Sequence, residues 1–295
     1  MLGAAFFAVC GLVGCRKAAP PEFDGQSAFG FLTEQCALGP RFPGSPGHAA
    51  VRRYLHEKLA GYGATVSEQP FEAALSTGDT LRLVNMIGAF RTEARTRILL
   101  GAHYDTRPRA DRDGNPANWS TPILGANDGA SGVAVLCEVA RLLGASKPPI
   151  GVDIVFFDGE DYGEEGNVQD YLLGSRHYAS SLGGSRPSAV IVIDMVGEHE
   201  ARFPREGLSE AASAALNERV YSIAGKLGIP NFVPAEGRTI IDDHLPFIQA
   251  ALPAIDIIDF DYPFWHTLED TPDKCSPASL NAVGRVLMSF IWEAR

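Results

Sequence analysis

Residues 152–161 read VDIVFFDGED, a largely apolar run that ends abruptly in three acidic side chains. A short apolar run of this kind is typical of a strand that is buried on both faces of a sheet. Residues 97–105, RILLGAHYD, repeat the pattern with a histidine and an aspartate after the run. Since binding sites in open α/β sheets form at the carboxyl ends of the strands, these two segments predict both the fold class and the position of a site.

The rest of the chain alternates between apolar runs and amphipathic stretches, which predicts a single α/β domain over residues 25–295. We expect a central, mostly parallel, twisted mixed sheet with helices on both faces. The expected strands are 65–71, 83–90, 97–102, 152–157, 189–195 and 254–258. The expected helices are 46–62, 129–143, 172–182, 209–227 and 277–293.

The composition is that of a globular protein with an acidic surface. Of 295 residues, 45% are hydrophobic and 21% are charged, so the chain can bury a substantial core. The formal net charge of -11 repels phosphate backbones, so we expect no nucleic acid partner. The expected oligomeric state is a monomer.

The first residues differ from the rest of the chain. Residues 1–14, MLGAAFFAVCGLVG, carry no charged side chain, and the run is too short to span a bilayer as a helix but has the length of the apolar region of a signal peptide. It ends in Leu-Val-Gly before Cys15, which resembles a bacterial lipobox. We therefore expect a signal peptide over 1–15, lipidation of Cys15, a tether over 16–24, and a periplasmic protein of the bacterial cell envelope that is anchored to the membrane. Cleavage without lipidation is the alternative.

The cysteines do not suggest a thiolate metal site, because the chain has neither a CxxC motif nor a Cys-His cluster. Cys137 lies in an apolar helical stretch and is expected in the core. Cys36 and Cys275 could form a disulfide in an oxidising compartment, which the sequence leaves open.

Acidic and imidazole side chains recur at the ends of three predicted strands. His103 and Asp105 follow one strand, Asp194 ends another, and a third is followed by Asp158, Glu160 and Asp161. Each has an ordinary structural explanation when it is taken alone, since acidic turns are usually solvated and a lone histidine usually packs in the core. Three separate strand ends with such residues are more than loop composition predicts.

Two further candidates lie outside the predicted strands. Asp128 precedes a predicted helix and could be its N-cap, and His266 could be a packed loop residue. Together, however, these acids and imidazoles would bury several like charges near one another, at several kcal/mol each. A divalent cation removes this conflict, and Asp, Glu and His are normal zinc ligands. Glu160 could then move protons while the adjacent Asp161 binds the ion.

In combination, the motifs resemble a known superfamily. The segments HYD at 103–105, NDGASG at 127–132, FFDGED at 156–161, Asp194 and WHT at 265–267 occur in the order found in the zinc aminopeptidase superfamily, which includes the glutaminyl cyclases. The likeness covers roughly residues 25–293. It looks closest to the glutaminyl-peptide cyclotransferases of bacterial type, because of QDYLLGSRH at 169–177, DDHLPF at 242–247 and the tryptophan before His266.

This resemblance implies a set of roles around one zinc ion. Asp128, Asp161 and His266 would hold the ion, Glu160 would act as general acid and base, and Asp194 would be a hydrogen-bonding partner in catalysis.

The resemblance also implies how the substrate pocket is built. Trp265 would form a wall of the pocket, and an aspartate of the pair Asp242 and Asp243 would orient it. Two departures from the animal enzymes stand out, since residues 166–168 hold no second tryptophan and Asp161 replaces a glutamate.

The implied reaction is cyclisation of the N-terminal glutamine of a peptide or protein to pyroglutamate, with release of ammonia. The rival is an aminopeptidase with two zinc ions, in which His103 and Asp194 bind a second ion and Asp128 bridges the two. The tryptophan and the Asp-Asp-His run favour the cyclase. A serine hydrolase is not expected, because no Gly-x-Ser-x-Gly is present.

Overall fold

The computed structural model describes residues 19–164, 166–183 and 186–293. The expected signal peptide with Cys15 therefore lies outside the described residues. Within the described ranges, no helix is both long enough and apolar enough to cross a membrane.

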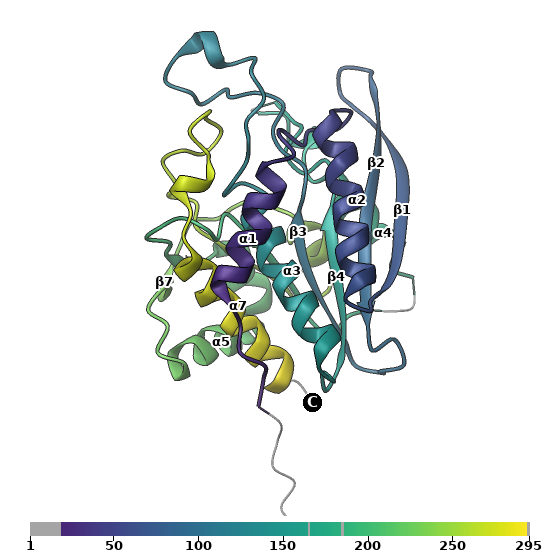
Figure 1. Ribbon diagram of the computed structural model, residues 1–295, viewed down its shortest axis with the longest axis vertical. Helices are drawn as coiled ribbons and strands as arrows, with labels where there is room; N and C mark the ends of the chain where they lie inside the picture. The colour runs from purple at the N-terminus through teal and green to yellow at the C-terminus, as the bar shows by residue number, and fades with distance from the viewer. Residues whose placement is uncertain (1–18, 165, 184–185, 294–295) are drawn as a thin grey trace, which may run out of the picture.

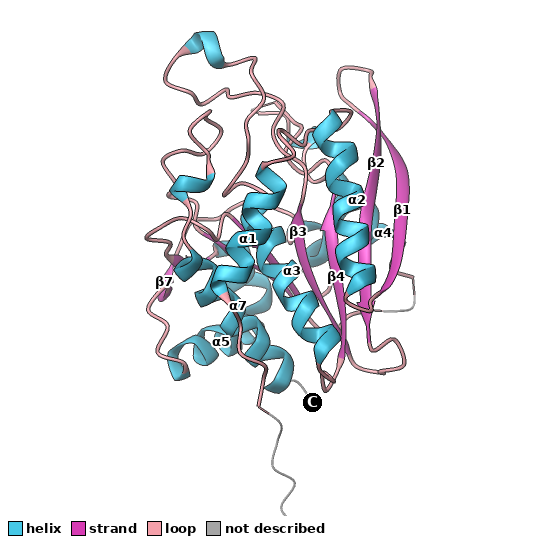
Figure 2. Cartoon of the chain, viewed as in Figure 1, coloured by secondary structure: helices cyan, strands magenta, loops and turns pink. Residues whose placement is uncertain are grey.

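The centre of the molecule is a six-stranded mixed sheet in the order β1-β2-β4-β3-β5-β8, which confirms the expected fold class. Figure 2 shows β1, β2, β4 and β3 side by side in this sheet. Neighbours are parallel from β4 to β8, whereas β2 is antiparallel to both β1 and β4. The inner parallel strands are almost wholly buried, which explains their continuous apolar sequences. The strands are β1 (Thr65–Ala74), β2 (Thr80–Phe90), β3 (Arg97–His103), β4 (Gly151–Phe157), β5 (Val190–Asp194) and β8 (Ala254–Ile258).

Helices cover both faces of the sheet, and the side chains of β3 show how the faces divide. Ile98 and Leu100 pack in the larger core, whereas Leu99 packs in the smaller core on the opposite face. The larger core is covered by α1 (Gly25–Cys36), α2 (Pro46–Gly61), α3 (Ala130–Ala145), α5 (Gly207–Lys226) and α7 (Pro277–Glu293), most of which lie over the near face in Figure 1. The smaller core is covered by α4 (Leu173–Ser181) and α6 (Leu245–Gln249).

Some elements are absent from the sequence-based expectation. These are α1, α6 and a small two-stranded sheet of β6 (Phe203–Arg205) and β7 (Phe232–Glu236). Helix α1 is capped by Asp24, whose carboxylate accepts from two backbone N–H groups. Phe23, inside the expected tether, is buried against Gly284 of α7. The packed domain therefore begins before residue 25.

The thiols of Cys36 and Cys275 are both buried and free, so the structure does not contain the disulfide that the sequence left open. Burial raises the pKa of the Cys36 thiol to about 11, which keeps it protonated at neutral pH. Cys137 is buried in α3, as expected.

The topology brings the predicted site residues to one edge of the sheet. His103 pairs in register with Phe157, and Asp194 pairs with Ile258, so the parallel strands end side by side. The segments that follow β3, β4, β5 and β8 consequently leave the sheet at the same edge, where a site is expected.

Candidate metal centre and active site

Asp128, Asp161 and His266 meet at this edge of the sheet, and all three are buried. The Nε2 atom of His266 lies 3.5 Å from Oδ2 of Asp128 and 3.3 Å from Oδ1 of Asp161. One ligand atom from each residue lies within 4.8 Å of the others. The turn before α3, the turn after β4 and the loop after β8 thus contribute one donor each.

These side chains fit a divalent cation. In the described part of the chain, neither Oδ2 of Asp128 nor Oδ2 of Asp161 has a hydrogen-bond partner. Burial and the charge of Asp161 raise the pKa of Asp128 to about 6, which reflects two buried carboxylates without enough compensation. Nor does Asp128 cap α3, because the N-cap is Gly129. Two carboxylates and an imidazole are a normal zinc donor set with a position left open.

A second group of donors shares Asp128. The Nε2 atom of His103 lies 3.1 Å from Oδ1 of Asp194 and 3.2 Å from Oδ1 of Asp128. Despite burial, the charge of Asp194 raises the pKa of His103 well above its ordinary value. These three residues also have the composition of a metal site.

A glycine allows the close approach that places Asp128. Gly129 has a φ of 93°, in the left-handed region. A Cβ atom there would lie 2.8 Å from the carbonyl oxygen of Asp105 and 3.0 Å from the ring of His103. Any other residue would push the turn that carries Asp128 away from the end of β3.

Asp270 holds the same turn from the other side. Its carboxylate accepts from the backbone N–H groups of Asn127 at 2.8 Å and Asp128 at 3.1 Å, and from the hydroxyl of Tyr262 at 2.8 Å. Burial and the charge of Asp128 raise the pKa of Asp270 to about 7. The sequence reading missed this residue, because nothing in the local pattern distinguishes it from a surface acid.

Asp105 connects the end of β3 with the turn after β4. Its two oxygens accept from the backbone N–H groups of Glu160 at 3.1 Å and Asp161 at 3.3 Å. Gly159, with a φ of 71°, begins this turn. Asp161 is therefore fixed among the metal donors, while the adjacent Glu160 is half-buried and lines the cavity.

The surroundings of Glu160 favour its protonated form. Burial raises the pKa of Glu160 well above its ordinary value, and the charges of Asp161, Asp242 and Asp243 add to this effect, while His103 opposes it. A cavity-lining glutamate with a raised pKa is a candidate for general acid and base catalysis.

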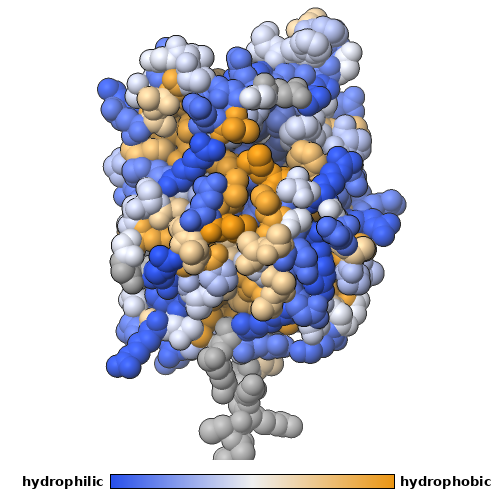
Figure 3. Space-filling model, turned by 180° about the vertical axis from the view of Figure 1, so that it is seen from behind, coloured by the Kyte–Doolittle hydropathy of each residue, from blue (hydrophilic) through white to orange (hydrophobic). Residues whose placement is uncertain are grey.

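A cavity of about 470 Å³ opens beside these groups. Its polar floor includes both acids of the turn after β4 and the side chains of Asp128, Asp194 and His266. Its apolar part includes Val168, Tyr171, Ile240, Ile241, Ile258, Phe260 and Trp265. On the side of the molecule opposite to Figure 1, hydrophobic residues gather in the middle of the face and hydrophilic residues surround them (Figure 3).

Trp265 lies in the wall of this cavity and is held by ring contacts. Its ring stacks on His266 with centroids 3.8 Å apart, and Phe260 follows at 5.0 Å. Asp242 also lines the cavity, but its Oδ1 accepts from the N–H of Asp243. Among the described residues, the other three oxygens of this pair have no hydrogen-bond partner. The expected orienting bond from this pair to the indole is therefore not seen.

Sequence reasoning also missed Arg107, which is fully buried in the loop after β3. Its Nη1 lies 2.8 Å from Oδ1 of Asp161. Its Nε and Nη2 donate to the two oxygens of Asp111 at 2.7 and 2.6 Å. The only signal in the sequence is an arginine and an aspartate four positions apart, shortly after a strand that ends in a predicted site.

Comparisons with known proteins identify the family of this chain and similar solved structures. The model of one family, described as peptidase family M28, matches residues 85–291. A glutaminyl cyclase from Bacteroides thetaiotaomicron, solved with N-acetylhistamine bound, is 38% identical, with 94% of this chain and 100% of that chain covered and a TM-score of 0.91. A leucine aminopeptidase precursor from the same organism is 39% identical, with 93% and 99% covered and a TM-score of 0.91. The glutaminyl-peptide cyclotransferase of the snake Boiga irregularis is 26% identical, with 86% of this chain and 77% of the relative covered.

Proposed function

This chain belongs to peptidase family M28, and within that family we propose that it is a glutaminyl-peptide cyclotransferase. The reaction converts the N-terminal glutamine of a peptide or protein to pyroglutamate and releases ammonia. The observation that carries the proposal is that Glu160 lines the same cavity as the buried metal donors and the stacked Trp265. The likeness to bacterial glutaminyl cyclases along nearly the whole chain supports it.

The proposed cofactor is one zinc ion, held by Asp128, Asp161 and His266. Each of the three residues offers one ligand atom within 4.8 Å of the others. Together they would supply three ligands and leave a further position open, as in a catalytic zinc site. When bound, zinc would act as a Lewis acid that polarises the side-chain amide carbonyl of the substrate glutamine.

Glu160 would move the proton of the reaction. The α-amino nitrogen attacks the side-chain amide carbon, forming the ring C–N bond, and Glu160 accepts the proton that this nitrogen loses. Glu160 then delivers the proton to the departing nitrogen as the bond between carbon and that nitrogen breaks, so ammonia leaves. Acid and base assistance of this kind is typically worth about 10²–10⁴-fold in rate. Asp194, on the same floor, would be the hydrogen-bonding partner.

The apolar wall has a different task. The nucleophile and the electrophile belong to the same residue, so the pocket must bend the glutamine side chain and keep water away from it. The ring of Trp265, supported by Phe260 at 5.0 Å, offers a flat apolar surface for this purpose.

One experiment tests the proposal. Purified protein is given a peptide that begins with glutamine and a chromogenic leucine amide. The expected result is ammonia and a ring-closed product from the peptide, with no cleavage of the amide. The opposite result rejects the cyclase.

A second candidate function is a metallo-aminopeptidase with two zinc ions. The donor group formed by His103, Asp128 and Asp194 favours it, since it could hold a second ion. Cleavage of the leucine amide, together with two zinc ions per protein by metal analysis, would support this candidate.

We propose in addition that the protein is a periplasmic lipoprotein, anchored through Cys15, that acts as a monomer. The support is the apolar run that ends at the lipobox-like Leu-Val-Gly-Cys. Metabolic labelling with a lipid analogue is expected to mark the wild-type protein and not Cys15→Ser. Equal labelling of both forms rejects Cys15 as the attachment point, and light scattering on the purified protein tests the monomer.

A further inference from the structure

Arg107 stands out among the buried charges because two carboxylates share it. It lies in the loop after β3, and its side chain is only 1% exposed. It binds Asp161 through Nη1 at 2.8 Å and Asp111 through Nε and Nη2 at 2.7 and 2.6 Å. The guanidinium also faces the ring of Tyr171, with its central carbon 5.6 Å from the ring centroid. The mechanism proposed above gives it no task.

We propose that Arg107 is a positioning residue for the metal centre, which fixes two of the three ligands relative to each other. This inference rests on the metal site of the proposed function. Arg107 binds Oδ1 of Asp161, and this same oxygen lies 3.3 Å from Nε2 of His266. The contact therefore fixes the carboxylate of Asp161 relative to the other ligands, while its Oδ2 keeps no hydrogen-bond partner among the described residues.

The second ligand is reached through Asp111. Its Oδ1 lies 3.6 Å from Nδ1 of His266, on the side of the ring away from the donor nitrogen Nε2. Asp161, Arg107, Asp111 and His266 thus form a continuous chain of contacts around the site. Carboxylates that support a metal-binding histidine or carboxylate in this way orient the ligand.

The guanidinium is suited to this task and an ammonium is not. Arginine offers five donors in a rigid plane, so it can bind one carboxylate in bidentate fashion and a second one at the same time. Lysine would keep the positive charge, but its one nitrogen on a flexible stem could not reproduce both contacts. An Arg107→Lys substitution therefore separates geometry from charge.

The same loop provides a matched control. Arg109 donates to the backbone oxygens of Gly163 at 2.8 Å and Tyr162 at 3.1 Å, so it also ties this loop to the one after β4. Within the described part of the chain, these bonds go to backbone oxygens and not to a metal ligand. If Arg107 merely joined two loops, Arg109→Lys would have the same effect as Arg107→Lys.

The experiment measures zinc affinity by competition with a chromophoric chelator, using wild type, Arg107→Lys, Asp111→Asn and Arg109→Lys. Folding of each chelator-treated protein is checked by thermal unfolding. Arg107→Lys and Asp111→Asn are expected to weaken zinc binding by about 10–100-fold, the usual effect of losing a support for a ligand. Arg109→Lys is expected to bind zinc like wild type.

Wild-type affinity in Arg107→Lys, or an equal loss in Arg109→Lys, overturns the proposal. Should Arg107→Lys fail to fold, the Asp111→Asn variant decides, because Asp111 is partly exposed and its replacement is better tolerated. Zinc affinity at the wild-type level in Asp111→Asn would also overturn the proposal. A wild-type protein that binds no zinc rejects the proposed function together with this inference. A wild-type protein that binds zinc but does not cyclise glutamine rejects the cyclase alone.

Discussion

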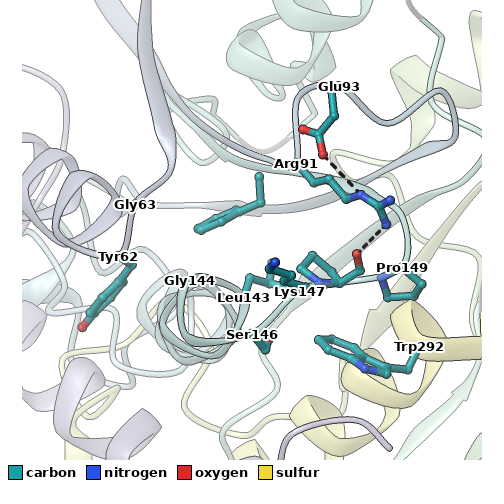
Figure 4. Close-up of a pocket in the computed structure, with 12 residues that line it drawn as sticks. Tyr62, Gly63, Arg91, Glu93, Leu143, Gly144, Ser146, Lys147, Pro149 and Trp292 are labelled. Atoms are coloured by element: carbon teal, nitrogen blue, oxygen red, sulfur yellow. Dashed lines mark hydrogen bonds and ion pairs between the residues drawn. The ribbon is translucent and has the colours of Figure 1, made fainter. Parts of the chain in front are cut away.

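A cavity lies at each end of the sheet, and the larger of the two has fewer features of a catalytic site. The cavity at the carboxyl ends of the strands measures about 470 Å³, whereas the one at the opposite end measures about 630 Å³. Figure 4 shows the larger cavity. Among the residues that line it are Tyr62, Phe90, Arg91, Lys147 and Trp292.

The charged groups of the two cavities have different surroundings. In the larger cavity, Arg91 donates to the carbonyl oxygen of Pro148 at 2.7 Å and lies 3.5 Å from exposed Glu93. Helices α2, α3 and α7 end near this cavity, and cations are favoured at helix C-termini. At the carboxyl ends, buried carboxylate oxygens lack partners among the described residues. Buried carboxylate oxygens without hydrogen-bond partners therefore indicate a ligand site better than cavity size does.

The largest effect is expected from Asp128→Asn, because Asp128 belongs to both donor groups. Zinc affinity should fall by more than about 100-fold, beyond the range for residues that only support a ligand, and cyclisation should be lost with it. Metal analysis after dialysis and an ammonia assay check both. Full zinc occupancy in this variant would show that the unpartnered carboxylates do not mark the cavity at the carboxyl ends of the strands as a metal site.

Glu160→Gln comes next. The amide cannot accept the proton, so the rate of cyclisation should fall by about 10²–10⁴-fold. Zinc binding should stay at the wild-type level, since Glu160 is not among the three donors. A variant that keeps its rate would exclude Glu160 as the proton shuttle, and one that loses zinc would make it a ligand.

Glu206 is a buried acid near the same cavity, but its carboxylate is well supplied with hydrogen-bond partners. Its carboxylate accepts from Ser209 and from the N–H of Ile240, and the ring of His244 lies 3.1 Å away. Although burial alone would raise it, these contacts hold the pKa of Glu206 at about 2, below its ordinary value of 4.5. Because the folded state favours the ionised carboxylate, Glu206 stabilises the fold above pH 4.5. This contribution to the free energy of unfolding is lost as the pH falls toward 2.

At pH 7, Glu206→Gln should lower the free energy of unfolding by up to about 3 kcal/mol. The difference from wild type should shrink as the pH falls from 4.5 to 2. Urea unfolding across this range measures it, with the exposed Glu72→Gln as a control that changes little. A difference that does not depend on pH would contradict the assignment.

The smallest effect is expected in the larger cavity. Arg91→Gln and Lys147→Gln are surface changes, so stability should shift by no more than about 0.5 kcal/mol. Zinc affinity and cyclisation should both be unchanged. A marked loss of cyclisation activity in either variant would show that the larger cavity contributes to function.

The sequence alone determined the sheet, most of the helices and the edge at which the site forms. Apolar runs and helical spacing are local patterns in the sequence. The polar residues at the ends of the apolar runs, such as His103, Asp161 and Asp194, are visible in the same local segments. Helix α1 escaped this reading, although Phe31 and Leu32 follow the capping Asp24 at helical spacing. The Asp-Asp-His run was recognised as a motif, but the sequence could not show that three carboxylate oxygens of its aspartates lack a hydrogen-bond partner among the described residues.

Only the tertiary structure showed which groups surround each acid. Asp158 looked equivalent to Glu160 and Asp161 in the sequence, yet it is paired with buried His48 at 2.9 Å and with the N–H of Val84 at 2.7 Å. In the sequence, Arg107 resembles an ordinary loop residue, whereas in the structure its guanidinium binds the carboxylate of Asp161. The physical reason is that the charge state of a buried group and its free lone pairs depend on partners tens of residues away, which no local pattern records.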